Sequence, residues 1–264
     1  MRNYDLITPE GTKDLLFGEC TIRRNIENTL LELFKKRGYS EMITPGLEFF
    51  DVFNLNSQYF PQENLYKLTD NKGRLLVMRP DSTMPIARVV ATRLREADLP
   101  LKLCYNQTVY RTEPALKGRS DEIVQTGIEL IGSQQKMADL EVISTAVDSL
   151  RAFGMEFSIE LGHIGVFKEL VSRLEATDKE KEKIRKLIEN KNFPALNDFL
   201  DTFGNSPVTN ALKKLPALFG GEEVFEKADE LIADDNVSAL LEELREIYTD
   251  ISEICVLCFL LPGL

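Results

Sequence analysis

The sequence has little of what marks a secreted, membrane-spanning or metal-binding protein. It contains 4 cysteines and 1 histidine, His163, among 264 residues. No apolar run reaches the roughly 18 to 20 residues that a membrane-spanning helix needs. The N-terminal stretch MRNYDLITPEGTKDLL has no apolar core of the signal-peptide type. We therefore expect a cytoplasmic protein that has no membrane partner.

Basic residues are also in short supply. The chain has 32 Lys and Arg against 43 Asp and Glu, which gives a formal net charge of -11. Proteins that bind nucleic acid usually carry a basic excess, because neutralised phosphates supply much of their affinity. The acidic balance therefore argues against a nucleic-acid partner. Hydrophobic residues make up 43% of the chain, which is ordinary for a globular protein that buries a core.

The motifs of common cofactor and metal sites are missing as well. The pair Cys255 and Cys258 spells CVLC, but it lies in an apolar run without a second CxxC. We expect these cysteines to be structural, because a free cysteine behaves as a small buried hydrophobe. The sequence also lacks a Walker loop, a GxGxxG fingerprint, a GxSxG elbow and an HExxH motif. We expect no cofactor and no metal site.

What the sequence does contain is a regular alternation of helical and strand periods up to residue 163. Helical spacing predicts helices over 14–37, 84–97 and 134–153, and Gly38 is a natural end for the first. The predicted strands lie within 39–49, 65–70, 74–80, 101–111, 121–132 and 155–163. This pattern is typical of an α+β protein, with an antiparallel sheet flanked by helices.

The pattern changes at Ile164. From 164 to 248 the sequence predicts short, charged helices separated by Pro and Gly, and residues 249–264 return to strand-like apolar sequence. We therefore expect a core over 1–163, a small helical insertion or appended domain over 164–248, and a returning, incomplete strand of the core over 249–264. Because an uncovered strand edge tends to pair with another chain, we also expect self-association through 251–262.

Polar residues interrupt this pattern near the start of the third predicted helix and on one strand. Strand 121–132 alternates so that Gln125, Gly127 and Glu129 share one face, which predicts a polar shelf with room above the glycine. Asp81 lies between a strand and a helix. It is either a helix cap, a role that suits Asp, or part of a pocket for an amine, and the two roles are not exclusive.

Basic residues gather at the end of strand 101–111 and in the loop that follows it. Arg111, Lys117 and Arg119 lie within nine residues of an otherwise acidic chain. A guanidinium group matches a carboxylate or a phosphate bidentately. The segment is therefore either an anion site or an ordinary polar hairpin loop.

Three stretches resemble the class II aminoacyl-tRNA synthetases, specifically histidyl-tRNA synthetase. PEGTKDLL at 9–16 resembles its N-terminal signature, and GYSEMITPGLEFFDVF at 38–53 resembles the first class motif. VYRTEPALKGRSDEIVQTGIELIG at 109–132 resembles the second motif. The resemblance covers residues 8–165 well and the helical region weakly. It implies a class II synthetase-like antiparallel sheet flanked by helices, and a homodimer through the 38–53 region.

The departures from that family point to a catalytically silent relative. Residues 79–83 spell RPDST where the synthetase has RPEGT, and Ile123 stands where the synthetase stacks an aromatic residue on adenine. The third motif, the paired-tyrosine stretch that recognises histidine and the anticodon-binding domain have no counterpart. RPDSTMPIARV instead resembles the regulatory subunits of ATP phosphoribosyltransferase. The resemblance therefore implies no catalytic residue.

The same resemblance implies a pocket for histidine. Asp81 and Thr83 correspond to positions that hold the α-amino group in the synthetase. Gln125 and Glu129 correspond to positions around the amino acid. Arg111 corresponds to the arginine that contacts the carboxylate and the α-phosphate, and Lys117 and Arg119 would be further anion contacts.

The function that this resemblance implies is regulatory. Such a subunit pairs with a short-form ATP phosphoribosyltransferase, the glycosyltransferase that begins histidine biosynthesis, and is needed for its activity and for feedback by histidine. Two alternatives stay open. A histidyl-tRNA synthetase, or a fragment of one, would need a third motif and an adenine-stacking residue. A synthetase-like small-molecule binding protein would fail to activate a short-form transferase in a mixing assay.

Overall fold

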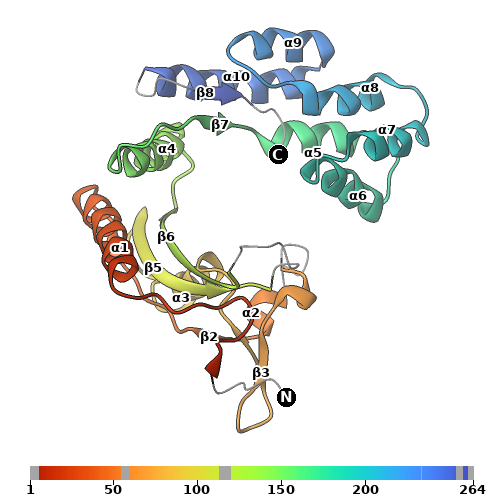
Figure 1. The fold of residues 1–264 in the computed structure, drawn as a ribbon. Coiled ribbons are helices and arrows are strands. Elements are labelled where there is room, and N and C mark those ends of the chain that lie inside the picture. The colour runs from red at the N-terminus through yellow and green to blue at the C-terminus, as the bar shows by residue number, and fades with distance from the viewer. Residues whose placement is uncertain (1–5, 55–59, 113–119, 233, 254–257, 261–264) are drawn as a thin grey trace. The chain divides into compact units, whose positions relative to one another are not determined.

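A computed structural model describes residues 6–54, 60–112, 120–232 and 234–253, and the backbone of 258–260 (Figure 1). The chain divides into two compact units, residues 1–134 and 135–264. Within the described residues, no helix combines the length and the apolar character needed to cross a membrane. Among the predicted features, Lys117, Arg119 and Cys255 lie outside the described residues.

The first unit alternates helices and strands, as its sequence predicts. Its elements are α1 (Gly18–Lys36), β1 (Ser40–Glu41), β2 (Leu47–Phe49), α2 (Asp51–Asn54), the 3-10 turn η2 (Gln62–Asn64), β3 (Lys67–Thr69), β4 (Leu75–Met78), α3 (Thr83–Thr92), β5 (Leu101–Tyr110) and β6 (Glu122–Ile131). The expected helix over 14–37 begins later, at Gly18, because Phe17 has a positive φ of 46° that is incompatible with a right-handed helix.

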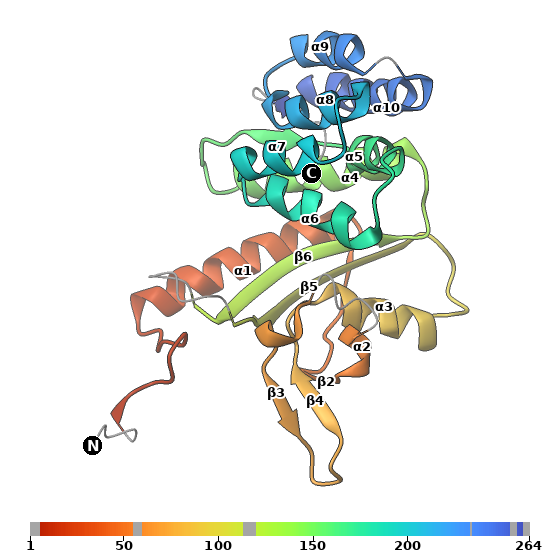
Figure 2. The ribbon, with the colours of Figure 1, turned by 90° about the vertical axis from the view of Figure 1, so that its right-hand side faces the viewer.

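Strands β5 and β6 form the long hairpin on which the unit is built. They pair antiparallel from Leu101↔Ile131 to Tyr110↔Glu122, and the short β1 adds to β5 in parallel. Figure 2 shows α1 along one side of this hairpin and α3 on the other. On the α1 side, Phe34 packs on Cys104, and on the α3 side, Ile86 packs against Leu103 and Tyr105.

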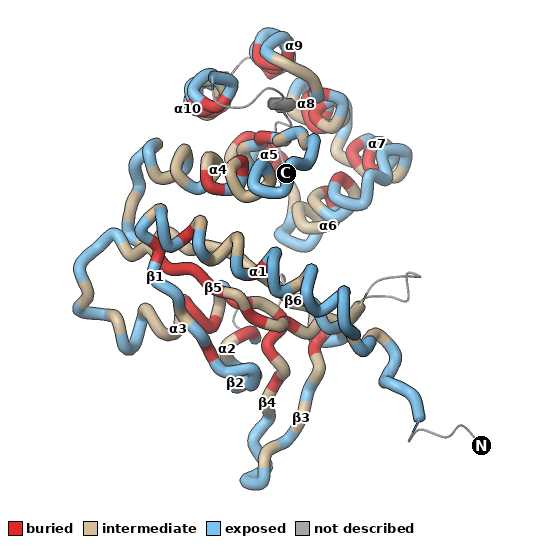
Figure 3. The backbone as a smooth tube through the Cα atoms, turned by 60° about the vertical axis from the view of Figure 1, so that its left-hand side comes forward, coloured by how far each residue is buried: buried red, intermediate tan, exposed pale blue. Residues whose placement is uncertain are grey.

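A second, smaller antiparallel sheet has the order β2-β4-β3. The hairpin between β3 and β4 turns at Gly73, whose φ of +76° explains why the sequence places a glycine there. Phe53, Leu65 and Val77 form the apolar cluster of this part. In Figure 3, buried positions run along β5. In β4 only Val77 is buried, and Arg79 and Pro80 just after it are buried as well. The α+β class predicted from the sequence is confirmed.

The second unit is mostly helical. Its elements are α4 (Lys136–Arg151), β7 (Ile159–Leu161), α5 (Ile164–Ser172), α6 (Asp178–Glu189), α7 (Phe193–Asp201), α8 (Pro207–Lys214), the 3-10 turn η3 (Leu215–Ala217), α9 (Glu223–Leu231), α10 (Asp235–Ser252) and β8 (Cys258–Leu260). Strand β8 pairs in parallel with β7.

Side-chain caps mark where several of these helices begin. Thr177 and Glu180 form a capping box at α6, and Ser206 and Thr209 form one at α8. Asp234 accepts hydrogen bonds from two backbone amides at the start of α10. The helices predicted after residue 164 are therefore confirmed, while the domain boundaries at 163 and 248 stay predictions.

Candidate functional site

Three of the predicted site residues, Thr83, Gln125 and Glu129, meet on the face of the β5–β6 hairpin that α3 covers. The register pairs Gln107 with Gln125, Tyr105 with Gly127 and Leu103 with Glu129. Directly paired residues of an antiparallel hairpin point to the same side, so these six positions share one face. The alternation predicted for strand 121–132 is thus confirmed, and the polar shelf faces the start of α3.

Hydrogen bonds tie the first turn of α3 to this shelf. The Thr83 hydroxyl donates to Glu129 Oε1 at 2.7 Å, and the backbone N–H of Ser82 donates to Gln125 Oε1 at 3.1 Å. The sequence separations of 46 and 43 residues show that the tertiary fold creates these contacts. The structure thus brings Thr83 to Gln125 and Glu129, the two residues that the sequence placed on one face of strand 121–132.

The two carboxylate oxygens of Asp81 have different partners. Oδ1 accepts a hydrogen bond from the Met84 backbone N–H at 3.2 Å, which helps to cap α3. Oδ2 lies 3.6 Å from Nη2 of Arg111. Arg111 is held in place by a 2.6 Å hydrogen bond from its Nε to the carbonyl of Pro80. Asp81 therefore contributes to the cap of α3 and also lines a cavity, while its role in a pocket for an amine stays a prediction.

A cavity of about 230 Å³ opens beside this ion pair. Its lining combines apolar side chains with the carboxylate and the guanidinium, and consists of Phe60, Pro61, Asn64, Leu65, Pro80, Asp81, Arg111 and Thr112. Arg111 retains 38% of its side-chain exposure, while Asp81 retains 14%. A small zwitterion could thus meet both charges in one place.

Two titratable groups near Asp81, Glu129 and Tyr105, have raised pKa values. Burial raises the pKa of the Glu129 carboxyl, the Thr83 hydrogen bond opposes this, and the nearby Asp81 carboxylate adds to it. Burial together with the carboxylates of Glu129 and Asp81 raises the pKa of Tyr105 to about 12. Among the described residues, Glu129 and Asp81 thus form an acidic, partly desolvated surrounding for Tyr105, and the guanidinium of Arg111 lies beside the Asp81 carboxylate.

The sequence missed Tyr105, and one expectation about its neighbour is wrong. We expected open room above Gly127, but the phenol of Tyr105 fills it. A Cβ at position 127 would lie 2.6 Å from the Tyr105 hydroxyl oxygen and 2.8 Å from Cζ. The glycine was the available signal, because a glycine inside a strand often marks a close approach of another group.

The sequence also missed the buried cation behind the site. Arg79 is only 5% exposed, and its guanidinium donates to the carbonyls of Thr44, Pro45 and Thr108 and to Gln107 Oε1. None of these acceptors is a carboxylate, and burial lowers the pKa of Arg79. This guanidinium joins the loop after β1 to strands β4 and β5, so it supports the residues just before Asp81.

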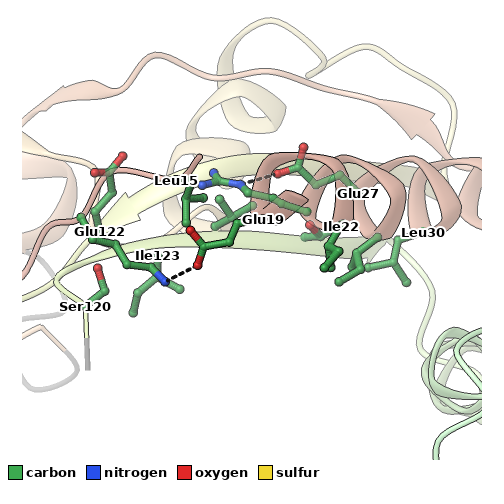
Figure 4. Close-up of a pocket in the computed structure, with 13 residues that line it drawn as sticks. Leu15, Glu19, Ile22, Glu27, Leu30, Ser120, Glu122 and Ile123 are labelled. Atoms are coloured by element: carbon green, nitrogen blue, oxygen red, sulfur yellow. Dashed lines mark hydrogen bonds and ion pairs between the residues drawn. The ribbon is translucent and has the colours of Figure 1, made fainter. Parts of the chain in front are cut away.

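A second feature of this unit is an open apolar groove of about 700 Å³ between α1 and β6 (Figure 4). Ile22, Ile26 and Leu30 of α1 face Ile123 and Val124 across it. Ile22 is 62% exposed and Ile26 42%, so this part of the apolar stripe of α1 is not used in the core of its own unit. The ion pair between Arg23 and Glu27, at 2.9 Å, lies along its rim.

Comparisons with known proteins place this geometry in a family. The ATP phosphoribosyltransferase regulatory subunit of Clostridium kluyveri is 45% identical over 259 residues, which cover 96% of this chain and 66% of that protein. The Clostridium acetobutylicum protein of the same name is 44% identical over 253 residues, or 94% of this chain and 62% of the relative. The chain thus spans less than two thirds of the length of these curated relatives.

A solved structure and a family match agree with these relatives. The crystal structure of an ATP phosphoribosyltransferase regulatory subunit/histidyl-tRNA synthetase from Bacillus halodurans matches with a TM-score of 0.87 at 29% identity, covering 98% of this chain and 68% of that one. The class II synthetase-like fold predicted from the sequence is therefore confirmed. The sequence model of the family described as Histidyl-tRNA synthetase matches residues 11–259. The chain belongs to the histidyl-tRNA synthetase family.

Proposed function

We propose that the chain acts as a non-catalytic regulatory subunit of ATP phosphoribosyltransferase, required for the first step of histidine biosynthesis and for its feedback regulation by histidine. The relatives that carry this name are 44–45% identical over almost the whole chain, which supports the proposal. The single structural observation that carries it is the pairing of Asp81 and Arg111 beside Thr83 and Glu129. The partner would be the short-form catalytic subunit, in the cytoplasm and without nucleic acid.

The chemistry of the pocket suits a free amino acid. Asp81 offers a carboxylate oxygen to an α-ammonium group, and Arg111 offers a guanidinium to an α-carboxylate. Glu129 and Gln125 remain for the ligand's side chain, and a carboxylate with a raised pKa is well suited to an N–H of an imidazole ring. We propose histidine as the ligand, bound by Asp81, Thr83, Arg111, Gln125 and Glu129.

Histidine can act as a feedback signal only if it distinguishes two states of the complex. Its binding must favour the less active state, and by reciprocity the less active state must bind histidine more tightly. A regulatory subunit needs no reacting group for this role. Ile123, which has no aromatic face for adenine, supports a pocket that binds without activating.

We also propose a homodimer through the 38–53 region. Ile43, Leu47 and Phe49 of this segment are 78%, 47% and 44% exposed, which is high for large apolar side chains. The apolar groove between α1 and β6 is a second surface of the same unit with exposed apolar side chains. Contiguous exposed apolar surface usually marks an interaction site. A dimer would remove it from water.

The test is a calorimetric titration of L-histidine into the purified chain, alone and then mixed with a short-form ATP phosphoribosyltransferase, with transferase activity measured in parallel. We expect histidine binding that Asp81→Ala and Glu129→Ala abolish, and transferase activity that appears on mixing and falls with histidine. Activation without any effect of these variants would remove the pocket from the proposal. Failure to activate the transferase, or ATP-dependent activation of histidine by the chain alone, would overturn the proposal itself.

A further inference from the structure

Three segments that lie far apart in the sequence meet at Asp121, which directly precedes β6. The backbone N–H of Asp121 donates to the carbonyl oxygen of Gly11 at 2.7 Å, and its own carbonyl oxygen accepts from the backbone N–H of Arg111 at 2.9 Å. The hydroxyl of Tyr66, just before β3, donates to Asp121 Oδ2 at 2.5 Å. One residue therefore joins the N-terminal segment, the start of β3 and the end of β5.

The packing around Asp121 fits these contacts closely. Gly11 has a φ of +78°, and a Cβ at this position would collide with the Asp121 carboxylate. The hydrogen bond to Asp121 is the main cause that raises the pKa of the Tyr66 hydroxyl, and burial adds to it. Tyr66 therefore stays protonated and remains a donor at physiological pH. We call the cluster of Gly11, Tyr66 and Asp121 the Asp121 junction.

The Asp121 junction connects two parts of the wall of the small cavity. Residues 64–65 and 111–112 both line this cavity of about 230 Å³. The first pair directly precedes Tyr66, and the backbone of the second is hydrogen-bonded to Asp121. A backbone hydrogen bond of 3.0 Å also joins the two pairs directly. Neither Tyr66 nor Asp121 is among the described residues that line the cavity, so the junction supports the wall from outside.

The guanidinium of Arg111 is the group that depends most on this support. Its Nε donates to the Pro80 carbonyl at 2.6 Å, and its Nη2 lies 3.6 Å from Oδ2 of Asp81, which is too long for a hydrogen bond. The side chain also keeps 38% of its exposure. The position of the Arg111 backbone, which the junction fixes, therefore decides where the terminal nitrogens of this side chain point.

We propose that Tyr66 and Asp121 are positioning residues: the Asp121 junction holds the Arg111 guanidinium toward the cavity and so sets the affinity for the carboxylate of the bound amino acid. This inference rests on the proposed histidine pocket and deepens it, because recognition of the free carboxylate then depends on residues that do not touch the ligand. A group that is held in its binding position beforehand binds more tightly, since less conformational entropy is lost on association.

The experiment compares L-histidine with L-histidinol, which has a hydroxymethyl group in place of the carboxylate, by calorimetric titration into the full chain. The variant Tyr66→Phe removes only the hydroxyl, and Tyr110→Phe is the matched control. Tyr110 directly precedes Arg111, but the charged neighbours of its hydroxyl are Glu122 and Arg79. We expect Tyr66→Phe to weaken histidine binding about tenfold, which is the effect of losing one hydrogen bond to a charged group.

Tyr66→Phe should leave the affinity for histidinol unchanged, because histidinol offers no carboxylate to Arg111. In an Arg111→Gln background, Tyr66→Phe should have no further effect on histidine, since both changes remove the same interaction. Tyr110→Phe should change neither affinity. An unchanged histidine affinity in Tyr66→Phe overturns the inference, and so does an equal loss for both ligands or an additive loss in the Arg111→Gln background.

Hydrogen exchange tests the Asp121 junction without any ligand. Tyr66→Phe should speed exchange of the Arg111 amide about tenfold, because its acceptor on Asp121 is no longer held by the hydroxyl. Wild-type exchange at this amide would overturn the inference. If the wild-type chain binds neither ligand, the proposed function fails, and the exchange result still decides whether the junction holds Arg111.

Gly11→Ala tests the contribution of the N-terminal segment. The added methyl group collides with the Asp121 carboxylate, so we expect at least a tenfold loss of histidine affinity and an unchanged affinity for histidinol. Gly18→Ala is the matched control, because a Cβ at position 18 meets no described atom within 4 Å. Wild-type histidine affinity in Gly11→Ala would overturn the assignment of Gly11 to the junction.

Discussion

Among the described residues, the unit formed by 135–264 has one continuous apolar core, whereas the unit formed by 1–134 has three small apolar clusters and several buried polar contacts. Leu196, Leu200 and Leu212 of the helical unit are completely buried. In the first unit the buried polar residues include Arg79, Glu48 and Thr44. The first unit therefore depends on directional hydrogen bonds, and the second on burial of apolar surface.

The difference concerns function as well as stability. A polar interior holds charged groups in fixed positions, which a binding pocket requires, but each such group must be satisfied. An apolar interior needs only a suitable total side-chain volume and hydrophobic pattern, so it tolerates substitutions more readily. The proposed site lies in the unit with the polar interior, where the pair of Arg88 and Glu48, at 2.6 Å, is a further example.

The largest effect that we expect comes from the apolar core. Leu212→Ala should lower the free energy of unfolding by about 3 kcal/mol, because it removes buried carbons and leaves a cavity. Hydrogen exchange measured by mass spectrometry should show the loss of protection in helices α5 to α10. Met137→Ala is the control, since Met137 is 68% exposed. Equal losses for the two variants would contradict a continuous core.

The second effect concerns the polar interior of the first unit. Arg79→Met should lower the free energy of unfolding by about 2 kcal/mol, because buried carbonyls and Gln107 lose their donor. Protection should fall in β4 and β5. Arg74→Met is the matched control, since the Arg74 side chain is 54% exposed and pairs with Asp70 at the surface. That control should cost about 0.5 kcal/mol or less. If Arg79→Met leaves the free energy of unfolding unchanged, the hydrogen bonds of the guanidinium do not stabilise this unit.

The smallest effect has the opposite sign. Burial raises the pKa of Glu129 in the folded state, so this group stabilises the fold most at low pH, and that contribution is lost as pH rises through the folded pKa. At pH 7 the buried charge therefore costs stability. Glu129→Gln should gain on the order of 0.5 kcal/mol at pH 7. This gain in stability should vanish when the pH falls below the ordinary carboxyl pKa of 4.5. The Glu129→Gln variant should also lose histidine binding.

Thermal melts of wild type and Glu129→Gln at several pH values measure this difference. Glu122→Gln is a suitable control, because Glu122 is an exposed carboxyl at the end of the same strand. A loss of stability in Glu129→Gln at pH 7 would mean that Glu129 is a structural ion. Glu129 would then resemble the buried polar residues that stabilise the fold, and its charge would give no support to a ligand site.

The sequence predicted the elements and the faces, because these follow from local periodicity. The side of β6 that carries Gln125 and Glu129 is set by alternation alone, and the turn at Gly73 by the need for a positive φ. The start of α1 was placed too early, because nothing local distinguishes residues 14–17 from a helical turn. Strand faces and tight turns depend on residues that are close together in the sequence, so they can be predicted from it.

The contacts of Arg79 and Tyr105 could not be predicted, because they depend on register between distant segments. Arg79 meets Thr44 across 35 residues and Gln107 across 28. Tyr105 lies over Gly127 only because β5 and β6 pair without an offset at this point. A shift by one residue would turn the opposite face toward α3 and remove the pocket. The identity of these partners is therefore a property of the fold.

Asp81 links the cavity to the backbone of α3 through a hydrogen bond. One of its oxygens holds the amide of Met84, and the other faces Arg111 and the cavity. In the proposed complex, an ammonium group bound to Asp81 would therefore also change the surroundings of the first turn of α3. The chemical shift of the Met84 amide, measured by nuclear magnetic resonance, would then report whether the proposed pocket is occupied.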